Sequence, residues 1–209
     1  MPAAKRGRRP DRALAERRRT EILDAAARLF AERGYADTDL DDLAGRLGVG
    51  KGTVYRYFPS KETLFFAAAD RAMHLLLESV NGSVAAVKDP LGRIEAAIRA
   101  HLAWFDRNPW AAELLIQERA QFRDRPTPTY FAHRDANLAP WTALLRGLIA
   151  AGRIRRIPVA RIVDVLSEML YGVIFTGYFS KRRRSLGRRI DDVVDVAFHG
   201  IAQRRGAGR

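Results

Sequence analysis

The sequence predicts an all-α protein, and three observations lead to this prediction. Apolar residues recur at helical spacing along nearly the whole chain of 209 residues, as at Ile22, Ala26 and Leu29. Residues that start or stop helices interrupt these runs at regular intervals. No stretch alternates apolar and polar residues for long enough to suggest a sheet, and no internal repeat is evident. We expect about nine helices in total.

The first helices follow from their end signals. The spacing predicts a helix over 12–33 that stops at Gly34. Asp39 is a good N-cap for a second, short helix, which ends before Gly48, where a left-handed residue closes a helix at little cost. A third short helix opens after Gly50 and ends at Pro59.

The later helices are bounded in the same way. Ser60 caps a long fourth helix, and Pro after Asp or Asn marks the next two starts. We expect helices to start or stop at the following places: Ser60, Asp89-Pro90, Asn108-Pro109, the loop 125–128, Gly152, Pro158 and Ser180. A seventh helix contains Leu138 and Leu148, an eighth runs from Pro158 to about Ser180, and a ninth spans roughly Leu186 to Gln203.

Composition narrows the class of partner. Hydrophobic residues make up 47% of the chain, enough for a real core, and 37 Lys and Arg against 24 Asp and Glu give a net charge of +13. This excess favours a polyanion, either nucleic acid or an anionic membrane surface. The longest apolar run, near 170–179, is far shorter than the roughly 20 residues of a spanning helix. With no signal peptide visible and no cysteine, we expect a cytoplasmic protein that does not enter membranes.

Residues 38–64 form the most informative segment, because they predict two short helices joined by a tight turn. In the second of these helices Val54 and Phe58 supply a buried face. The remaining positions are polar, basic or small: Lys51, Gly52, Thr53, Tyr55, Arg56 and Tyr57. A short helix with such a face suits the major groove of DNA, so this segment predicts a helix-turn-helix.

Two motifs resemble the TetR (tetracycline repressor) family, including its AcrR-type members. The first is G-x-x-T-x-Y-x-x-F-x-[SN]-K-E-x-L, from Gly50 to Leu64, and the second is R-R-x-x-I-L-x-A-A-x-x-L-F-x-x-x-G-Y, from Arg18 to Tyr35. The resemblance extends from Arg18 to Leu64, about a quarter of the chain. The chain departs from the family at Asp39, where members commonly carry Thr. The Asp39 carboxylate adds negative charge beside the expected phosphates.

The resemblance and the expected exposure together suggest how this segment contacts DNA. Lys51, Thr53 and Arg56 are candidates for base contacts, whereas Tyr55, Tyr57 and Lys61 should position the helix on phosphates. Gly52 and Thr38 complete the expected interface. The basic segment that contains Arg6, Arg8 and Arg9 has no apolar residue to bury, so we expect a flexible arm that enters the minor groove or contacts phosphates. The open alternative is a solvated tail.

These features predict three parts of the chain: a basic arm over 1–14, a DNA-binding domain over 15–60, and a helical effector-binding and dimerisation domain over 61–209. The helix over 158–180 is apolar nearly all round, and the last helix carries one apolar stripe. TetR-like proteins dimerise through their last two helices, so we expect a homodimer. The expected interface residues are Leu166, Leu170, Val173, Val194, Phe198 and Ile201.

The second domain is also expected to hold a small-molecule effector, since the resemblance implies one and aromatic side chains line many pockets. The candidate lining residues are Trp104, Phe105, Trp110, Phe122, Trp141, Glu168, Met169, Tyr171 and Phe175. Core packing is the alternative for each aromatic residue. Glu168 and Glu118 need partners in apolar surroundings, either an internal Arg or a cationic ligand.

The sequence does not predict an enzyme, a metal site or a cofactor. It has no Gly-rich phosphate loop, no G-x-S-x-G elbow, no cysteine nucleophile, and no paired histidines at helical spacing. We therefore expect a DNA-binding transcriptional regulator, a repressor that leaves a palindromic operator when an unidentified small molecule binds. The alternative is a DNA-binding regulator without such an effector, of the nucleoid type or controlled by a protein partner.

Overall fold

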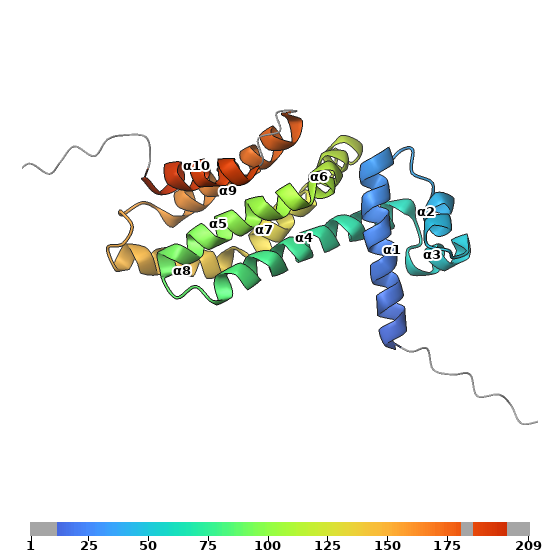
Figure 1. Cartoon of the computed structure of the whole chain (residues 1–209), viewed down its shortest axis with the longest axis horizontal. Helices are drawn as coiled ribbons and strands as arrows, with labels where there is room; N and C mark the ends of the chain where they lie inside the picture. The colour runs from blue at the N-terminus through green and yellow to red at the C-terminus, as the bar shows by residue number, and fades with distance from the viewer. Residues whose placement is uncertain (1–11, 181–185, 200–209) are drawn as a thin grey trace, which may run out of the picture. The chain divides into compact units, whose positions relative to one another are not determined.

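The computed structural model describes residues 12–180 and 186–199, and this part of the chain is all-α as predicted (Figure 1). No strand occurs within these two ranges. They contain ten helices: α1 (Arg12–Arg33), α2 (Leu40–Arg46), α3 (Lys51–Tyr57), α4 (Lys61–Ala85), α5 (Pro90–Arg107), α6 (Pro109–Gln121), α7 (Thr129–Ala136), α8 (Leu138–Ala150), α9 (Val159–Phe179) and α10 (Leu186–His199). The chain divides into two compact units between Ala72 and Met73.

The first unit is built around aromatic packing between α1 and the start of α4. The ring of Phe30 meets that of Phe65 edge to face at 5.1 Å, and Tyr35 lies against both. α2 contacts both α1 and α3. The fully buried large side chains of this unit come from α1, α2, the residue that follows α3 and the start of α4: Ile22, Leu29, Phe30, Leu43, Phe58, Leu64 and Phe65. Together they form the core of the first unit.

The end signals read from the sequence are confirmed in this unit. Asp39 caps α2 by accepting a hydrogen bond from the backbone N–H of Asp41 at 2.9 Å. Gly34 and Gly48 have φ of 86° and 62°, a conformation that other residues rarely adopt. Ser60 accepts from the backbone N–H of Thr63 at 3.0 Å and so starts α4. Local sequence is therefore sufficient to set these ends.

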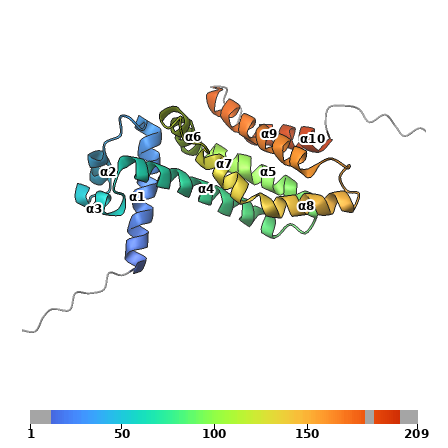
Figure 2. The same cartoon turned by 180° about the vertical axis from the view of Figure 1, so that it is seen from behind.

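The second unit is organised around α5, which contacts α6, α8, α9 and α10 (Figure 2). Its start is the predicted one, with Asp89 as N-cap and Pro90 in the first turn. Ile98, Leu102 and Leu114 are buried in the core of this unit, together with Ile174 from α9. Ile174 is the buried residue of α9, so much of that apolar helix remains accessible to solvent.

The described residues contain ten helices where the sequence predicts about nine, and the additional one is α7. Glu118 explains why α7 forms. Its Oε1 accepts hydrogen bonds from the backbone N–H of Thr129 at 2.9 Å and from the Thr129 hydroxyl at 3.0 Å. The start of α7 is thus satisfied by a buried carboxylate eleven positions away. A contact between residues this far apart in the sequence cannot be predicted from local sequence patterns.

In the part of the chain that the structure describes, no helix is long and apolar enough to cross a membrane.

Candidate nucleic-acid interface and ligand cavity

α3 presents the polar face that the sequence predicted. Val54 and Phe58 are 0% and 1% exposed and hold the helix on the core of the first unit. The opposite positions reach solvent fully or in part: Lys51, Gly52, Thr53, Tyr55, Arg56 and Tyr57. A helix anchored on one face with donors on the other is compatible with insertion into a major groove.

Arg56 is the α3 cation best placed to reach DNA. Its guanidinium lies 5.6 Å from the ring centre of Tyr57 and is exposed. No carboxylate among the described residues forms an ion pair with it. Its five donors therefore remain available to a guanine edge or a phosphate.

Lys51 has a partner already. Its ammonium donates to a carboxylate oxygen of Asp41 on α2 at 2.7 Å, and this hydrogen bond raises the pKa of Lys51. Both side chains are about half exposed, with values of 48% and 55%. An exposed pair of this kind contributes little to stability, so DNA can displace Asp41.

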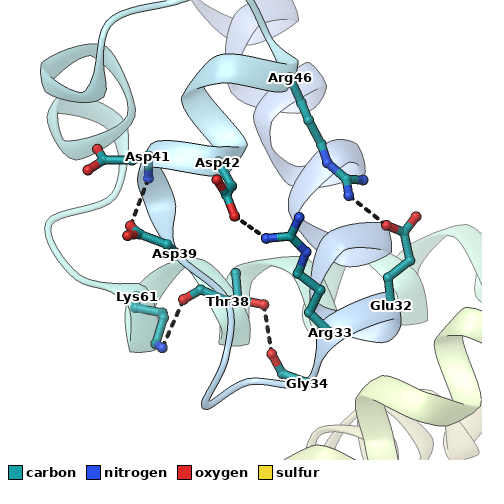
Figure 3. Close-up of polar contacts among 9 residues, drawn as sticks. All are labelled: Glu32, Arg33, Gly34, Thr38, Asp39, Asp41, Asp42, Arg46 and Lys61. Atoms are coloured by element: carbon teal, nitrogen blue, oxygen red, sulfur yellow. Dashed lines mark hydrogen bonds and ion pairs between the residues drawn. The ribbon is translucent and has the colours of Figure 1, made fainter.

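Lys61 and Thr38 hold the connection between α1 and α2 (Figure 3). The Lys61 ammonium donates to the backbone carbonyls of Ala36 and Thr38 at 2.9 and 3.0 Å, and lies 4.8 Å from the ring centre of Tyr35. Thr38 is buried, and its hydroxyl donates to the Gly34 carbonyl at 2.7 Å. These contacts give both residues a role inside the domain that differs from the expected contact with DNA.

The carboxylates near α2 are largely neutralised by basic residues of the same unit (Figure 3). Asp42 pairs with Arg33, and Glu32 pairs with Arg46 at 2.8 Å. The hydrogen bond from Arg46 lowers the pKa of Glu32. The negative charge that Asp39 and its neighbours bring to this region is thereby reduced.

Residues 1–11 of the expected arm lie outside the described residues, and residues 12–14 belong to α1. Arg6, Arg8 and Arg9 therefore remain predictions, as does Ile201 of the expected dimer interface.

The second unit contains two adjoining cavities of about 150 and 160 Å³. They share six lining residues from α4, α5, α8 and α9: Val80, His101, Leu138, Trp141, Ser167 and Leu170. The first cavity is otherwise lined by Ile94, Ala97, Ile98, Leu145, Val163 and Leu166. The second adds a polar end, formed by Tyr130, His133, Arg134 and Asn137. We call the two together the His101 cavity.

Trp141 is the sequence-predicted pocket residue that lines the His101 cavity. Trp104 and Phe105 are buried and pack edge to face at 5.1 Å, and Trp110 lies 6.1 Å from Trp104. The rings of Tyr171 and Phe175 lie 4.3 Å apart in a tilted arrangement. The other predicted pocket residues, Phe122 and Met169, are half-buried outside the cavity lining, and Glu168 is exposed.

Sequence reasoning missed most of the cavity. His101 and Tyr130 are not among the pocket residues that the sequence predicts. Leu166 and Leu170, which the sequence predicts in a dimer interface, also line the cavity. The lining comes from several separate helices, so the signal is spread over distant parts of the sequence.

His101 supplies a neutral polar group inside the cavity. Its Nε2 lies 3.3 Å from the Tyr130 hydroxyl. Burial lowers the pKa of His101 to about 4 and raises that of Tyr130, so both groups are uncharged at neutral pH. His133, which lines the polar end of the cavity, meets His74 edge to face at 4.8 Å.

The comparisons with known proteins point to one family. Residues 22–68, which include α2, α3 and the start of α4, match the family described as bacterial regulatory proteins, tetR family. The HTH-type transcriptional activator FasR of Mycolicibacterium smegmatis is 30% identical over 110 residues, which are 53% of this chain and 50% of FasR. The nucleoid occlusion factor SlmA of Aliivibrio fischeri is 32% identical over 108 residues, which are 51% of this chain and 55% of SlmA. The chain thus spans about half the length of these relatives.

This chain matches two solved structures of similar fold over almost their whole length. The TetR family transcriptional regulator PfmR of Thermus thermophilus has a TM-score of 0.70 and 26% identity, over 87% of this chain and 99% of PfmR. The transcriptional regulator FadR of Bacillus subtilis, solved with stearoyl-CoA, has a TM-score of 0.72 at 19% identity, over 88% of this chain and 99% of FadR. The likeness to FadR shows the fold alone.

Replacing Lys61 with Met should destabilise the first unit. The variant keeps the aliphatic stem but loses both hydrogen bonds to the Ala36 and Thr38 carbonyls, so the free energy of unfolding should fall by about 1–2 kcal/mol. Urea denaturation of K61M measures this loss, and K88M, which removes an exposed Lys of the second unit, is the control. An unchanged midpoint together with weaker DNA binding would show instead that Lys61 contacts phosphates, as the sequence predicted.

His101 should make stability depend on pH. Because its pKa is lowered on folding, the unfolded chain binds the proton first, so this contribution is complete above the ordinary pKa of 6.5 and is lost as pH falls toward 4. Between pH 7.5 and 5, wild type should lose about 2 kcal/mol more than H101Q in denaturant titrations. H199Q, which removes an exposed histidine, should behave like wild type. Equal losses in wild type and H101Q would refute this interpretation.

Proposed function

We propose that this chain, which belongs to the TetR family of bacterial regulatory proteins, is a transcriptional regulator that binds a palindromic operator as a homodimer. A small molecule in the second unit releases the DNA. The observation that carries the proposal is α3, whose buried Val54 and Phe58 leave the polar face of the helix open, with Arg56 without an acidic partner in the described chain. Its place of action is the cytoplasm, where bacterial DNA lies. The named relatives are regulators of transcription or nucleoid occlusion.

DNA reading rests on a division of labour along α3. Arg56 reads a base edge, and Thr53 and Lys51 assist once DNA has displaced Asp41 from Lys51. Tyr55, which is 41% exposed, and Tyr57 contact the phosphate backbone. The arm arginines Arg6, Arg8 and Arg9 add contacts that are mainly electrostatic.

The homodimer is supported by the apolar surface that α9 and α10 leave uncovered. Val165 and Phe179 on α9 are 56% and 65% exposed, and Val196 on α10 is 47% exposed. Val194, by contrast, is buried in its own subunit, where α10 packs against α5. Val173 and Phe198 are half-buried and remain candidates. We propose an interface centred on the exposed positions, since exposed large apolar groups at this density commonly mark interaction surfaces.

Release is explained by a shift between two conformations. Met73, Leu76, Leu77 and Val80 line the cavities from α4, the helix that begins directly after α3. A ligand that favours a different position of these side chains favours a different course of α4. The two recognition helices of a dimer must match major grooves about 34 Å apart, so such a change weakens binding to the operator.

A second candidate function is DNA binding without a small-molecule effector. The 32% identity to the nucleoid occlusion factor SlmA supports it. The two functions differ at the His101 cavity, since only the first requires it to be filled. A thermal shift by a small molecule, abolished by a side chain that fills the cavity, distinguishes them.

Replacing Arg56 with Ala should relax the base preference at one position of each half-site. A bidentate Arg–guanine contact contributes about 1–3 kcal/mol of discrimination, so selection from a random DNA library should lose most of that preference. R107A removes the same charge from the second unit and should select the wild-type motif. If R56A selected the wild-type motif as well, Arg56 would not read a base.

Replacing Val165 with Glu should dissociate the dimer, because it buries two unpaired carboxylates in the proposed interface. Light scattering should report a folded monomer, and a full palindrome should bind no better than a half-site. A139E, at an exposed position of α8, should remain dimeric. If V165E stayed dimeric while F198E dissociated, the interface would lie on the stripe of α10 that the sequence predicted.

A further inference from the structure

We infer that the His101 cavity binds one small apolar molecule carrying an acceptor oxygen, of the carbonyl or carboxylate type, and that the His101–Tyr130 pair donates a hydrogen bond to that oxygen. The inference rests on the proposed function, since it names the class of effector. It is independent of the DNA contacts, because every lining residue belongs to the second unit.

The size of the cavity limits the ligand. Its two parts measure about 150 and 160 Å³. An apolar cavity of about 150 Å³ holds one benzene molecule, so the two adjoining parts together accommodate ~10–12 non-hydrogen atoms. A medium-length chain or a substituted ring fits this space.

The walls require an apolar body. Around the first part of the cavity, aliphatic side chains from α5, α8 and α9 dominate, including Ile98, Leu145 and Leu166. Trp141 closes both parts. A polar group placed here would lose its hydration without a partner, at a cost that excludes sugars and other polyhydroxy compounds.

The number of donor hydrogens at the polar end of the cavity indicates that the ligand supplies an acceptor. A neutral imidazole has one N–H and a phenol has one O–H, and the contact between His101 and Tyr130 at 3.3 Å uses one of the two. Within the described part of the chain no acceptor takes the other. Both side chains line the cavity, so a ligand oxygen there completes the pair. Leaving the donor unmatched is unfavourable, which gives the site its preference.

The charges around the cavity exclude cations. None of the residues that line its two parts is acidic. The two carboxylates suspected from the sequence are elsewhere, because Glu168 is exposed and Glu118 accepts from Thr129. The charged side chain at the polar end is that of Arg134, which pairs with Asp135 at 2.7 Å. An anionic or a neutral oxygen is therefore acceptable, and an ammonium group is not.

The test compares ligands of equal size on the full-length protein by calorimetry, without DNA. 2-Nonanone and 1-decene have the same number of non-hydrogen atoms and differ in the acceptor oxygen. Wild type should bind the ketone about tenfold more tightly, since one hydrogen bond in an apolar site is worth roughly 1–2 kcal/mol. In the double variant H101L/Y130F, which removes both donors, this preference for the ketone should be lost, and in H199L it should stay at the wild-type value.

Two further binding experiments test the same inference. L170W fills a position shared by both parts of the cavity and should abolish binding of both ligands even if H101L/Y130F fails to fold. Octanoate tests the charge: tighter binding than 2-nonanone, lost in R134Q, supports a carboxylate head group, and weaker binding supports a neutral carbonyl. Equal affinity of wild type for ketone and alkene, or tighter binding of octylamine than of either oxygen compound, would overturn the inference.

Release of DNA is measured separately with the motif selected by wild type. If binding of 2-nonanone depends on the His101–Tyr130 pair but leaves the protein on DNA, the ligand site stands and its role as effector site fails. If wild type selects no DNA motif at all, the regulator function fails while the calorimetric result still decides the ligand class.

Discussion

The first unit depends on one constraint: α3 has seven residues and is too short to be stable by itself. Its geometry comes from the burial of Val54 and Phe58, which are 0% and 1% exposed, against a core formed by α1, α2 and the start of α4. The aromatic cluster of Phe30, Tyr35 and Phe65 joins the two longer helices of that core. Because packing on the core stabilises α3, its outer face does not need apolar residues. That face consists of donors and small residues. The apolar core and the polar reading face are thus two sides of the same arrangement.

Acidic residues around this core are paired with basic residues of the same unit. Asp41 and Asp42 would oppose DNA if they were unpaired, but each meets a cation of the same unit, Lys51 and Arg33. These pairs are exposed and weak, so a phosphate can replace the carboxylate beside Lys51 at little cost. Lys61 differs, because its ammonium donates to two backbone carbonyls of its own unit and not to a carboxylate. The same residue type therefore serves stability at one position and remains available for binding at another.

The second unit uses its apolar surface in two ways. α9 contributes Val163, Leu166 and Leu170 to the cavity, while Val165 and Phe179 on the same helix face solvent. A helix that is apolar on nearly all sides can line an internal cavity with one face and leave apolar side chains exposed on another. Inside the cavity, the neutral His101 and Tyr130 are the polar exception, and their spare hydrogen is the feature on which ligand preference depends.

The sequence by itself determined the all-α class, the helix-turn-helix and most helix ends, because capping residues, left-handed glycines and prolines act over a few positions. Asp39, Gly48 and Asp89 do this work through local hydrogen bonds and backbone conformation. Only the tertiary structure decided the start of α7, which depends on Glu118, and the inward bonds of Lys61. It also decided which face of α10 packs on α5, and which residues of five helices surround the cavity. The physical reason is the same in each case: these features join groups that are distant in sequence, and nothing in the local pattern records which partner a side chain will meet.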